Sequence, residues 1–479
     1  RDRRSQLMVN IKITTLKGVQ ARVGLSRTHW RNIRTAPAEK RIKILVLNAG
    51  SSSFKYGLFS VPAKPAGMDL LPKESTLLAS GQIDQIGGPP DKPNIVTLEI
   101  PGRAPIKLKS VKQIKTNHEA FHEALKILTH KHHAVIENIS DIGAVGHRVA
   151  HGGNLSKAAI IDDKVMGLIR TASTWAPLHN PANIAVIEAA QQALSSALHV
   201  AVFDTAFHQT MPPESYTYAI PRELSQRLGV RRYGFHGNSY KFILQTMASE
   251  LERKESELDL IICHLGSGAS MACIQQGKCV DTSMGMTPTA GLVMGTRCGD
   301  LDPGLPSTLA RVLNVSLADV GNILNKKGGL VGLCGTSDMR EVEQAALRGE
   351  EDAVLAEKVY VQRIRKYLGS YLVRLHGDVD AVVFTGGVGE NSARIRGMVC
   401  EGLQRFGISL DAKKNAGRSV GPLEISSAQS FARVFVVHTN EELSIALQSV
   451  TCLAEAAQLD SRAREVVATE AGSASGAGG

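Results

Sequence analysis

Short apolar runs recur along the chain, and each leads into a turn of small or polar residues. The runs cover residues 44–47, 200–203, 260–263 and 381–384. They show no alternation of apolar and polar positions, which is typical of strands buried on both faces. Helical patterns separate them. These patterns cover residues 118–138, 181–197, 240–251, 305–325 and 341–376. Strands that alternate with helices predict an α/β fold.

The first run begins a hairpin at residues 44–59, whose turn contains Asn48, Gly50 and three serines. Such a turn lets the backbone approach a phosphate and offers it N–H and O–H donors. An ordinary hairpin is the alternative. A partial copy follows at residues 260–274, where His264-Leu-Gly-Ser aligns with Asn48-Ala-Gly-Ser, 216 positions earlier. The repeat predicts duplicated halves that face each other across a cleft.

Three further polar side chains lie at the ends of predicted strands or at the start of a helix. Arg148 precedes a Gly-Gly turn, where its planar guanidinium could pair with a carboxylate. His179 stands before a helix that we expect Asn180 to cap. Asp204 ends a buried strand, a common place for a ligand-facing acid. The alternatives are a surface arginine, a capping histidine and a structural aspartate.

Glycine-flanked turns supply the remaining candidates. His236 lies at the centre of Tyr-Gly-Phe-His-Gly-Asn-Ser, and Arg297 lies in Gly-Thr-Arg-Cys-Gly-Asp. The segment Gly386–Glu390 follows a strand and leads into a helix, whose first N–H groups favour phosphate or ribose. A Gly-Gly-x-Gly pattern alone is a weak signal.

Composition is that of a soluble globular protein of two or three domains, with 479 residues, 43% hydrophobic and 21% charged. Residues 1–40 carry ten basic and two acidic residues, so they hold eight of the ten net positive charges. The body therefore has no basic patch that indicates nucleic acid. This Arg-rich, acid-poor segment resembles an organellar transit peptide, and a disordered basic extension is the alternative.

The cysteines and the apolar segments argue against a disulfide-rich, zinc-knuckle or membrane protein. The seven cysteines are odd in number and contain no C-x-x-C pair, which predicts reduced thiols without a disulfide framework or a zinc knuckle. No apolar run approaches the roughly 20 residues that cross a bilayer, so we expect no membrane partner. The Ala/Gly/Ser-rich segment 457–479 is predicted to be disordered.

Nine motifs, in order, resemble the acetate kinase family over residues 43–455. They read LNAGSSSFKYGLF, GHRVAHGG, APLHNP, FDTAFHQTMP, YGFHGNS, HLGSGAS, DTSMGMTPTAGLVMGTRCGDLDP, TGGVGEN and TNEEL. The resemblance implies two duplicated RNase H-like domains of the sugar kinase, Hsp70 and actin superfamily, with a cleft between them. We expect one domain at 41–205, completed by 441–456, and a nucleotide-binding domain at 206–440.

The resemblance also implies the activity and the residues behind it. The activity is reversible, Mg²⁺-dependent transfer of the ATP γ-phosphate to acetate, with Mn²⁺ as an alternative ion and a homodimer as the assembly. The positions that match the family's catalytic groups are His179, Asp204, His236 and Arg297. The acetate-binding positions are Arg148, Ala150, Leu178, Phe235 and Pro288, and the metal-associated positions are Asn48 and Glu441. The nucleotide-binding positions are Lys55 with the Ser51–Ser53 turn, His264, Leu265, Gly266, Ser267, Gly268, Asp338, Met339, Arg340, Gly386, Gly387, Val388, Gly389 and Glu390.

Two positions depart from the family pattern. Ser267 replaces a frequent Asn and is shorter, which alters one contact to phosphate or to a metal-bound water. Ala150 replaces a Val that lines the methyl pocket, so we expect side activity on propionate. Propionate kinase is the alternative within this chemistry, and a non-metabolic ATPase of the same superfamily is the alternative outside it. The expected location is the mitochondrion or chloroplast, or the cytoplasm if residues 1–40 are not a transit peptide.

Overall fold

The computed structural model describes residues 41–475 except Ser51, Asp69, Pro90, Asp91, Val111, Ala134 and Leu178, with side chains up to Ser461. The predictions for residues 1–40, Ser51 and Leu178 therefore lie outside the described residues. By internal contacts the described chain divides into two units. Unit 1 contains residues up to Val149, Lys157–Val202 and the chain from Ile445, and unit 2 contains Ala150–Ser156 and Phe203–Ser444.

Unit 1 is built on a mixed sheet that has eight strands among the described residues, in the order β5-β4-β3-β2-β1-β6-β8-β7. Strands β1 and β2 form the antiparallel hairpin, and β6 pairs with β1 in parallel. The strands are β1 (Arg41–Ala49), β2 (Ser53–Pro62), β3 (Thr76–Asp84), β4 (Ile95–Glu99), β5 (Ile106–Lys109), β6 (Ala144–Val149), β7 (Ala159–Ile160) and β8 (Leu198–Phe203). The helices are η1 (Pro72–Glu74), α3 (Asn117–Leu128), η2 (Ile139–Asp141), α4 (Asp163–Ala172), α5 (Asn180–Ala193) and α17 (Glu441–Ser475).

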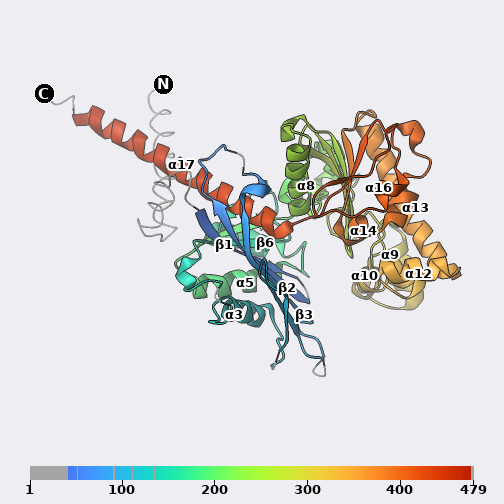
Figure 1. Cartoon of the computed structure of the whole chain (residues 1–479), viewed down its shortest axis with the longest axis horizontal. Helices are drawn as coiled ribbons and strands as arrows, with labels where there is room; N and C mark the ends of the chain where they lie inside the picture. Colours follow the sequence, from blue (N-terminus) through green and yellow to red (C-terminus); the bar gives the residue numbers. More distant parts are fainter. Residues whose placement is uncertain are drawn as a thin grey trace. The chain divides into compact units, whose positions relative to one another are not determined.

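Helices cover both faces of this sheet, which explains why β1 has the continuous apolar run of a doubly covered strand. Alternate β1 residues Leu45 and Leu47 pack in one core with residues of α3 and α5 (Figure 1). On the other face, a side chain at Gly146 of β6 would collide with Ile445 and Ser449 of α17. A C-terminal helix therefore completes a sheet whose first strand lies near residue 41.

Unit 2 contains a mixed sheet with six strands among the described residues, in the order β11-β10-β9-β12-β14-β13. The strands are β9 (Leu260–Leu265), β10 (Ala269–Gln275), β11 (Lys278–Thr282), β12 (Ala381–Thr385), β13 (Leu423–Glu424) and β14 (Arg433–Val436). The longer helices are α7 (Arg222–Leu228), α8 (Gly237–Glu250), α9 (Leu305–Leu313), α10 (Leu317–Lys326), α12 (Met339–Leu347), α13 (Glu351–Arg374) and α15 (Ala393–Cys400). The short ones are η3 (Ala206–Thr210), α6 (Pro213–Tyr216), η4 (Glu255–Glu257), α11 (Gly329–Cys334), α14 (Gly386–Asn391), η5 (Gln404–Phe406) and α16 (Ala412–Asn415).

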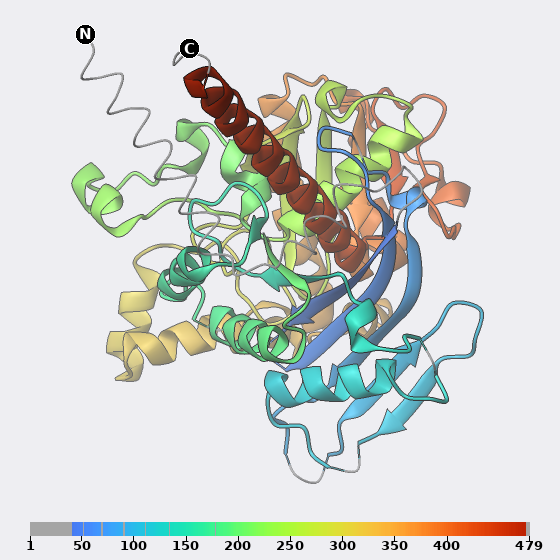
Figure 2. The same ribbon diagram turned by 90° about the vertical axis from the view of Figure 1, so that its left-hand side faces the viewer.

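The sheet of unit 2 separates two apolar cores. Helices α13 and α15 pack on one face and α8 packs on the other (Figure 1). Helices α9 and α10, drawn in yellow in Figure 2, form a pair in which Val320 is the residue buried most completely. No helix in the described ranges is long and apolar enough to cross a membrane.

The predicted α/β class with strand-to-turn hairpins in each half is confirmed. Two expected helices are interrupted: Asn314 separates α9 from α10, and Gly349 separates α12 from α13, both with positive φ. The expected disorder from residue 457 is wrong as far as Ser475, because α17 continues to that residue. Ala, Leu, Glu and Arg in this segment favour helix, and Leu453 and Ala457 are buried.

Candidate functional site

In unit 1 two candidate residues lie in the last residues of neighbouring strands. Asn48 on β1 lies opposite Lys55 on β2. Leu47 of β1 is in register with His147 of β6, so Asn48 and Arg148 come next on two adjacent parallel strands. Their carboxyl ends meet at one edge of the sheet, as expected for a ligand-binding edge of an α/β fold.

Two asparagines that the sequence reasoning missed hold the turn after β1. The Nδ2 of Asn183 donates to the carbonyl of Ala49 at 3.0 Å, and the Nδ2 of Asn117 donates to that of Gly50, also at 3.0 Å. The Gly50 N–H donates to the Ser53 carbonyl at 2.8 Å. The turn is therefore fixed to α5 and α3. The sequence predicted both helices, but it did not show which of their side chains contact the turn.

His179 occupies the N-cap position of α5, but its side chain makes no capping hydrogen bond. The expectation that Asn180 caps this helix is wrong, because Asn180 is its first helical residue and its Nδ2 donates to the carbonyl of Ile169 at 3.2 Å. The imidazole of His179 is half-buried and is not used to end the helix. The capping alternative for His179 is thus removed.

In unit 2, Asp204 is buried at the start of α8. Its Oδ1 accepts a hydrogen bond from Asn238 Nδ2 at 2.7 Å, and its carbonyl accepts one from the Gly237 N–H at 3.0 Å. A Cβ on Gly237 would lie 2.2 Å from that carbonyl oxygen, so only glycine fits. The close approach fixes the Asp204 carboxylate against the first turn of α8.

His236, with φ of 57°, directly precedes α8. Its Nδ1 lies 2.8 Å from Ser270 Oγ, which is also bonded to the hydroxyl of Tyr240. Burial raises the pKa of Tyr240 well above its ordinary value, so this phenol keeps its proton and can donate to Ser270. The Ser270 hydroxyl can then donate to Nδ1, which leaves the His236 proton on Nε2.

The Nε2 of His236 and the guanidinium of Arg297 reach the same glycine. A methyl group on Gly268 would lie 3.4 Å from His236 Nε2 and 3.5 Å from Arg297 Nη1. Arg297 Nη1 also donates to the carbonyl of Pro288 at 3.2 Å. The geometry brings two predicted catalytic groups together at one turn, where both can donate to an anion.

A second histidine supports the first. The rings of His236 and His264 stack with centroids 4.3 Å apart, and His264 Nδ1 lies 2.8 Å from Ser239 Oγ. Burial lowers the pKa of His264 to about 4, against smaller opposing effects of Glu390 and Asp204. His264 is therefore neutral near pH 7 and can stack on His236 without charge repulsion.

The loop that carries Arg297 is held by residues that the sequence reasoning did not single out. Asp300 accepts from the Gly291 N–H at 2.8 Å and from the hydroxyl of Tyr367 at 2.7 Å. Arg363 Nη1 donates to the Gly291 carbonyl, also at 2.8 Å. Tyr367 and Arg363 belong to α13, so this helix supports both ends of the loop. We name Asp300, Gly291, Tyr367 and Arg363 the loop clamp.

The predicted nucleotide-binding turns adjoin one another in unit 2. Strands β9 and β12 are parallel neighbours, and Thr385 is in register with His264. A Cβ on Gly386, which has φ of 76°, would lie 2.9 Å from the Leu265 carbonyl. The turns 266–268 and 386–389 therefore meet with main-chain groups close together, as a phosphate or ribose site requires.

The side-chain carboxylate of Glu390 holds these turns through hydrogen bonds to backbone N–H groups. Its Oε1 accepts from the N–H of Gly386 at 2.9 Å and from that of Thr439 at 3.1 Å, and its Oε2 lies 2.7 Å from His438 Nδ1. Asp338 caps α12 and forms an ion pair with the exposed Arg340. These two carboxylates are engaged within the protein, which favours positioning roles for them.

The predicted acetate-binding residues Ala150, Phe235 and Pro288 belong to unit 2. Ala150 is buried, and the ring of His151 contacts that of Tyr233 with centroids 4.3 Å apart. The His151 and Phe235 centroids are 6.1 Å apart. Phe235 directly precedes His236, and the Pro288 carbonyl accepts a hydrogen bond from Arg297, so these two residues adjoin the His236 and Arg297 side chains. Leu178 is outside the described residues.

Comparison with known proteins identifies the family. The family model described as the acetokinase family matches residues 43–447. The chain belongs to this family. An acetate kinase from Staphylococcus haemolyticus is 44% identical over 409 residues, which are 85% of this chain and 98% of that protein. The family uses ATP.

Solved structures agree with this family assignment. The crystal structure of Porphyromonas gingivalis acetate kinase is similar with a TM-score of 0.76 and 39% identity, over 86% of this chain and 100% of that one. A propionate kinase from Francisella tularensis has a TM-score of 0.75 and 38% identity, over 85% and 98% of the two chains. The α/β fold with two mixed sheets is thus that of acetate and propionate kinases.

Proposed function

We propose that the protein is an acetate kinase that transfers the γ-phosphate of ATP reversibly to acetate, giving acetyl phosphate and ADP. The observation that carries this proposal is the convergence of His236 Nε2 and Arg297 Nη1 on the Gly268 turn. Two hydrogen-bond donors at a glycine-rich turn suit a transferring phosphoryl group, because they stabilise the negative charge on its oxygens in the transition state.

Acetate is an anion near pH 7, so its attack needs no general base. The barrier instead arises from bringing a carboxylate onto an anionic phosphate. In the proposed mechanism Arg148 binds the acetate carboxylate, and His179, His236 and Arg297 hold the phosphoryl group. Transfer is direct and in line, so a chiral γ-phosphate should be inverted. Net retention of configuration would show a phosphoenzyme and contradict this mechanism.

We propose that oxygen donors of this chain hold a magnesium ion that keeps part of its water shell. Asn48 and Glu441 are proposed as its protein donors, and both offer oxygen, which hard Mg²⁺ prefers. Within the described residues there is no group of three or more His, Cys, Asp or Glu side chains that could hold a metal by itself. A bound Mg²⁺, or Mn²⁺ in its place, would neutralise phosphate charge. Asp204 is proposed to orient the reacting groups.

Asn48→Ala tests this metal assignment. The variant should need more Mg²⁺ for half-maximal activity, while its circular dichroism spectrum stays that of the parent. Lys55→Ala is the matched control from the facing strand, and it should change the KM for ATP instead. An unchanged magnesium requirement in Asn48→Ala would leave the turn with a structural role.

The proposed nucleotide site comprises the turn 264–268, the segment 338–340 and the turn 386–390. Support comes from the meeting of glycine-rich turns on β9 and β12. We propose that Gly387, Val388 and Gly389 offer main-chain donors, while Glu390 and Asp338 keep the segments in place. Ser267 is exposed, and its short side chain leaves room beside the phosphates.

Side activity on propionate is proposed from Ala150, which is small and buried. The similar Francisella protein is titled a propionate kinase, so both acceptors occur among related enzymes. Propionate kinase is therefore the second candidate. Comparing kcat/KM for acetate and propionate separates the two: a higher value for propionate would favour the second candidate.

A hydroxamate assay with ATP, Mg²⁺ and acetate tests the proposed reaction directly. Acyl phosphate should form with the parent chain. With Arg297→Ala the rate should fall about 10²–10³-fold, the usual effect of removing one donor that stabilises transition-state charge. Arg311→Ala, on α9, is the matched control and should leave the rate unchanged. ATP hydrolysis without acyl phosphate would favour an ATPase of the same superfamily.

We also propose a homodimer and, for residues 1–40, a transit peptide that directs the protein to the mitochondrion or chloroplast. The proposal for residues 1–40 is supported by their excess of Arg and Lys. Imaging a tagged chain with and without these residues tests it. Cytoplasmic signal from both forms would contradict organelle targeting.

A further inference from the structure

Tyr240 of helix α8 supports His236 through both its backbone and its side chain. The Tyr240 N–H donates to the His236 carbonyl at 3.1 Å, a helical hydrogen bond at the start of α8. The Tyr240 hydroxyl bonds Ser270 Oγ, and that oxygen lies 2.8 Å from His236 Nδ1. We name the side chains of Tyr240 and Ser270 the hydroxyl relay. The relay thus ends on the imidazole of a residue whose backbone Tyr240 also holds.

The backbone of His236 is left-handed, with φ of 57° and ψ of 21°. This conformation is uncommon for a residue other than glycine, and it persists where the surrounding structure fixes it. The next residue is fixed in the same way, because the Gly237 N–H donates to the Asp204 carbonyl at 3.0 Å. A strained backbone with bonds on both sides indicates that His236 is held in place for its side chain.

The hairpin formed by β9 and β10 holds the His236 ring at its face and at its edge. His264 of β9 and Ser270 of β10 lie opposite each other in the antiparallel register. The His264 ring stacks on the His236 ring, and Ser270 holds Nδ1. Gly268 belongs to the turn of the same hairpin, where a Cβ would lie 3.4 Å from His236 Nε2. One hairpin therefore orients the imidazole and carries the turn that Nε2 faces.

The hydroxyl relay is buried, and its aromatic ring is packed. Tyr240 and Ser270 are both 0% exposed. The Tyr240 ring lies against the rings of Phe207 and His208, with centroids 6.1 Å and 5.6 Å away. Because bulk water does not reach these two hydroxyl groups, their protons must find acceptors within the protein.

A count of these protons gives the direction of each hydrogen bond. No side chain in the described ranges other than Ser270 bonds the Tyr240 hydroxyl, so Tyr240 donates to Ser270. Ser270 must then donate its own proton to its second partner, His236 Nδ1. If Ser270 donated to Tyr240, or if Nδ1 carried a proton, one buried O–H group would have no acceptor. An unpaired buried donor is more costly than a hydrogen bond is favourable.

We propose that Tyr240 and Ser270 are positioning residues for phosphoryl transfer, because they hold His236 in the tautomer that carries its proton on Nε2. This inference rests on the acetate kinase function proposed above and deepens it. Since Nδ1 accepts from Ser270, Nε2 donates towards the Gly268 turn. The opposite tautomer would present a lone pair to the phosphoryl oxygens and would repel them.

Tyr240→Phe tests the first hydroxyl, because it removes one oxygen atom and keeps the packed ring. Ser270 then loses its donor, so its proton is no longer directed to Nδ1. In the hydroxamate assay kcat should fall about tenfold, as expected for the loss of one buried hydrogen bond that positions a donor. The KM values for ATP and acetate should stay within about twofold of the parent, because the contacts of the bound substrates do not change.

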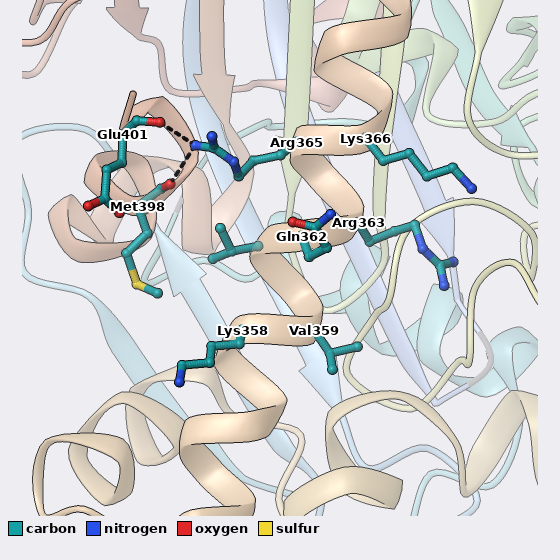
Figure 3. A pocket seen from close by; sticks show the side chains of 9 residues that line it. Lys358, Val359, Gln362, Arg363, Arg365, Lys366, Met398 and Glu401 are labelled. Carbon is teal, nitrogen blue, oxygen red and sulfur yellow. Dashed lines mark hydrogen bonds between the residues drawn. The ribbon is translucent and has the colours of Figure 1, made fainter. Parts of the chain in front are cut away.

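The matched control is Tyr360→Phe, which removes a hydroxyl from another buried tyrosine of unit 2. Tyr360 belongs to the stretch of α13 that is drawn in Figure 3, and its side chain packs in the core. Its hydroxyl has no hydrogen-bond partner among the described residues. The control should therefore keep the kcat of the parent.

Ser270→Ala tests whether the two hydroxyls act as one unit. Its kcat should fall at least as far as that of Tyr240→Phe, because the bond to Nδ1 is removed directly. In the double variant the losses should not add, since Tyr240 reaches His236 only through Ser270 in this relay. Additive losses would show that the two hydroxyls act independently and would contradict the relay.

Nitrogen NMR of the full chain with labelled histidine measures the tautomer itself. The His236 signals are identified by their loss in His236→Gln. In the parent, Nε2 should carry the proton and Nδ1 should be unprotonated. In Ser270→Ala, both tautomers should be populated. A purely structural role of the relay would leave this spectrum unchanged.

Three results would overturn the inference. The first is a proton on Nδ1 in the parent. The second is a kcat within about twofold of the parent in both Tyr240→Phe and Ser270→Ala. The third is a lower thermal midpoint in these variants with no change of tautomer, which would assign the hydroxyls to folding alone. A parent chain that forms no acyl phosphate would instead count against the proposed kinase activity, and the NMR spectra would still decide the tautomer.

Discussion

Gly268→Ala is the most direct perturbation of the candidate catalytic turn. Gly268 has no positive φ, so its backbone accepts alanine without strain. The new methyl group would lie 3.4 Å from His236 Nε2 and 3.5 Å from Arg297 Nη1, which are ordinary contact distances. The fold should therefore survive, while the space above the turn is filled.

The expected magnitude follows from these distances. An oxygen that accepts from both nitrogens over the turn must lie about 2.8–3.0 Å from each of them. The methyl group lies beside both nitrogens, so we expect it to displace the phosphoryl group from at least one donor. Loss of one such donor costs about 10²–10³ in rate. Because the contact strengthens in the transition state, kcat should fall more than KM rises.

Steady-state kinetics in the hydroxamate assay, with acetate and ATP varied separately, measure this effect. Gly167→Ala is the matched control, since it adds a methyl group at an open, exposed helical glycine. The thermal midpoint of both variants should stay within a few degrees of the parent. If Gly268→Ala keeps kcat/KM within threefold of the parent, the phosphoryl group does not lie over this turn and the reasoning is wrong.

Three further predictions concern the acceptor pocket, the loop and pH. Ala150→Val adds two methyl groups to a buried wall, so the propionate-to-acetate ratio of kcat/KM should fall about fourfold, at about 0.8 kcal/mol per CH₂; an unchanged ratio would remove Ala150 from the pocket. Asp300→Asn weakens the loop clamp, because Asp300 accepts hydrogen bonds from both Gly291 and Tyr367, so kcat should fall about tenfold. The kcat of Tyr367→Phe should also fall. Equal kcat values in the parent and both variants would show that the clamp has no part in positioning Arg297. Burial lowers the pKa of His208 to about 4, below its ordinary 6.5, so the unfolded chain binds more protons below pH 6.5 and stability decreases as pH falls through that value. For one such histidine, the free energy of unfolding at pH 5 is lower by about 2 kcal/mol. The urea midpoint of His208→Gln should therefore change less between pH 7 and pH 5 than that of the parent. An equal change would contradict a buried, neutral His208.

Local patterns were sufficient for the four buried strands β1, β8, β9 and β12 and for the turns that follow them. The continuous apolar runs of β1 and β9 are consequences of burial on both faces, and that condition leaves a direct trace in sequence. Helix ends were harder. Asn314 and Gly349 interrupt helices whose periodic patterns continue on both sides. The segment up to Ser475 is helical although its Ala/Gly/Ser content resembles that of a linker, because its other residues favour helix.

Candidate chemistry was visible at glycine-rich turns and at polar residues within two positions of a glycine. His236, Arg297 and the turns at 266–268 and 386–389 were found in this way, since close backbone approach requires glycine. The residues that support them were not visible. Asp300, Tyr367 and Asn183 have no special neighbours in sequence, and their roles depend on hydrogen bonds to segments 9 to 134 positions away.

The sequence by itself determined the α/β class, the repeated hairpin and the types of residue available for phosphoryl transfer. These properties depend on burial, glycine and charge, which act within a few residues. Only the tertiary structure decided that His236 and Arg297 share one turn, that His264 is neutral beneath His236, and that α13 supports the Arg297 loop. Distances between remote segments and the degree of burial are set by the packing of the whole chain, so no local pattern carries them.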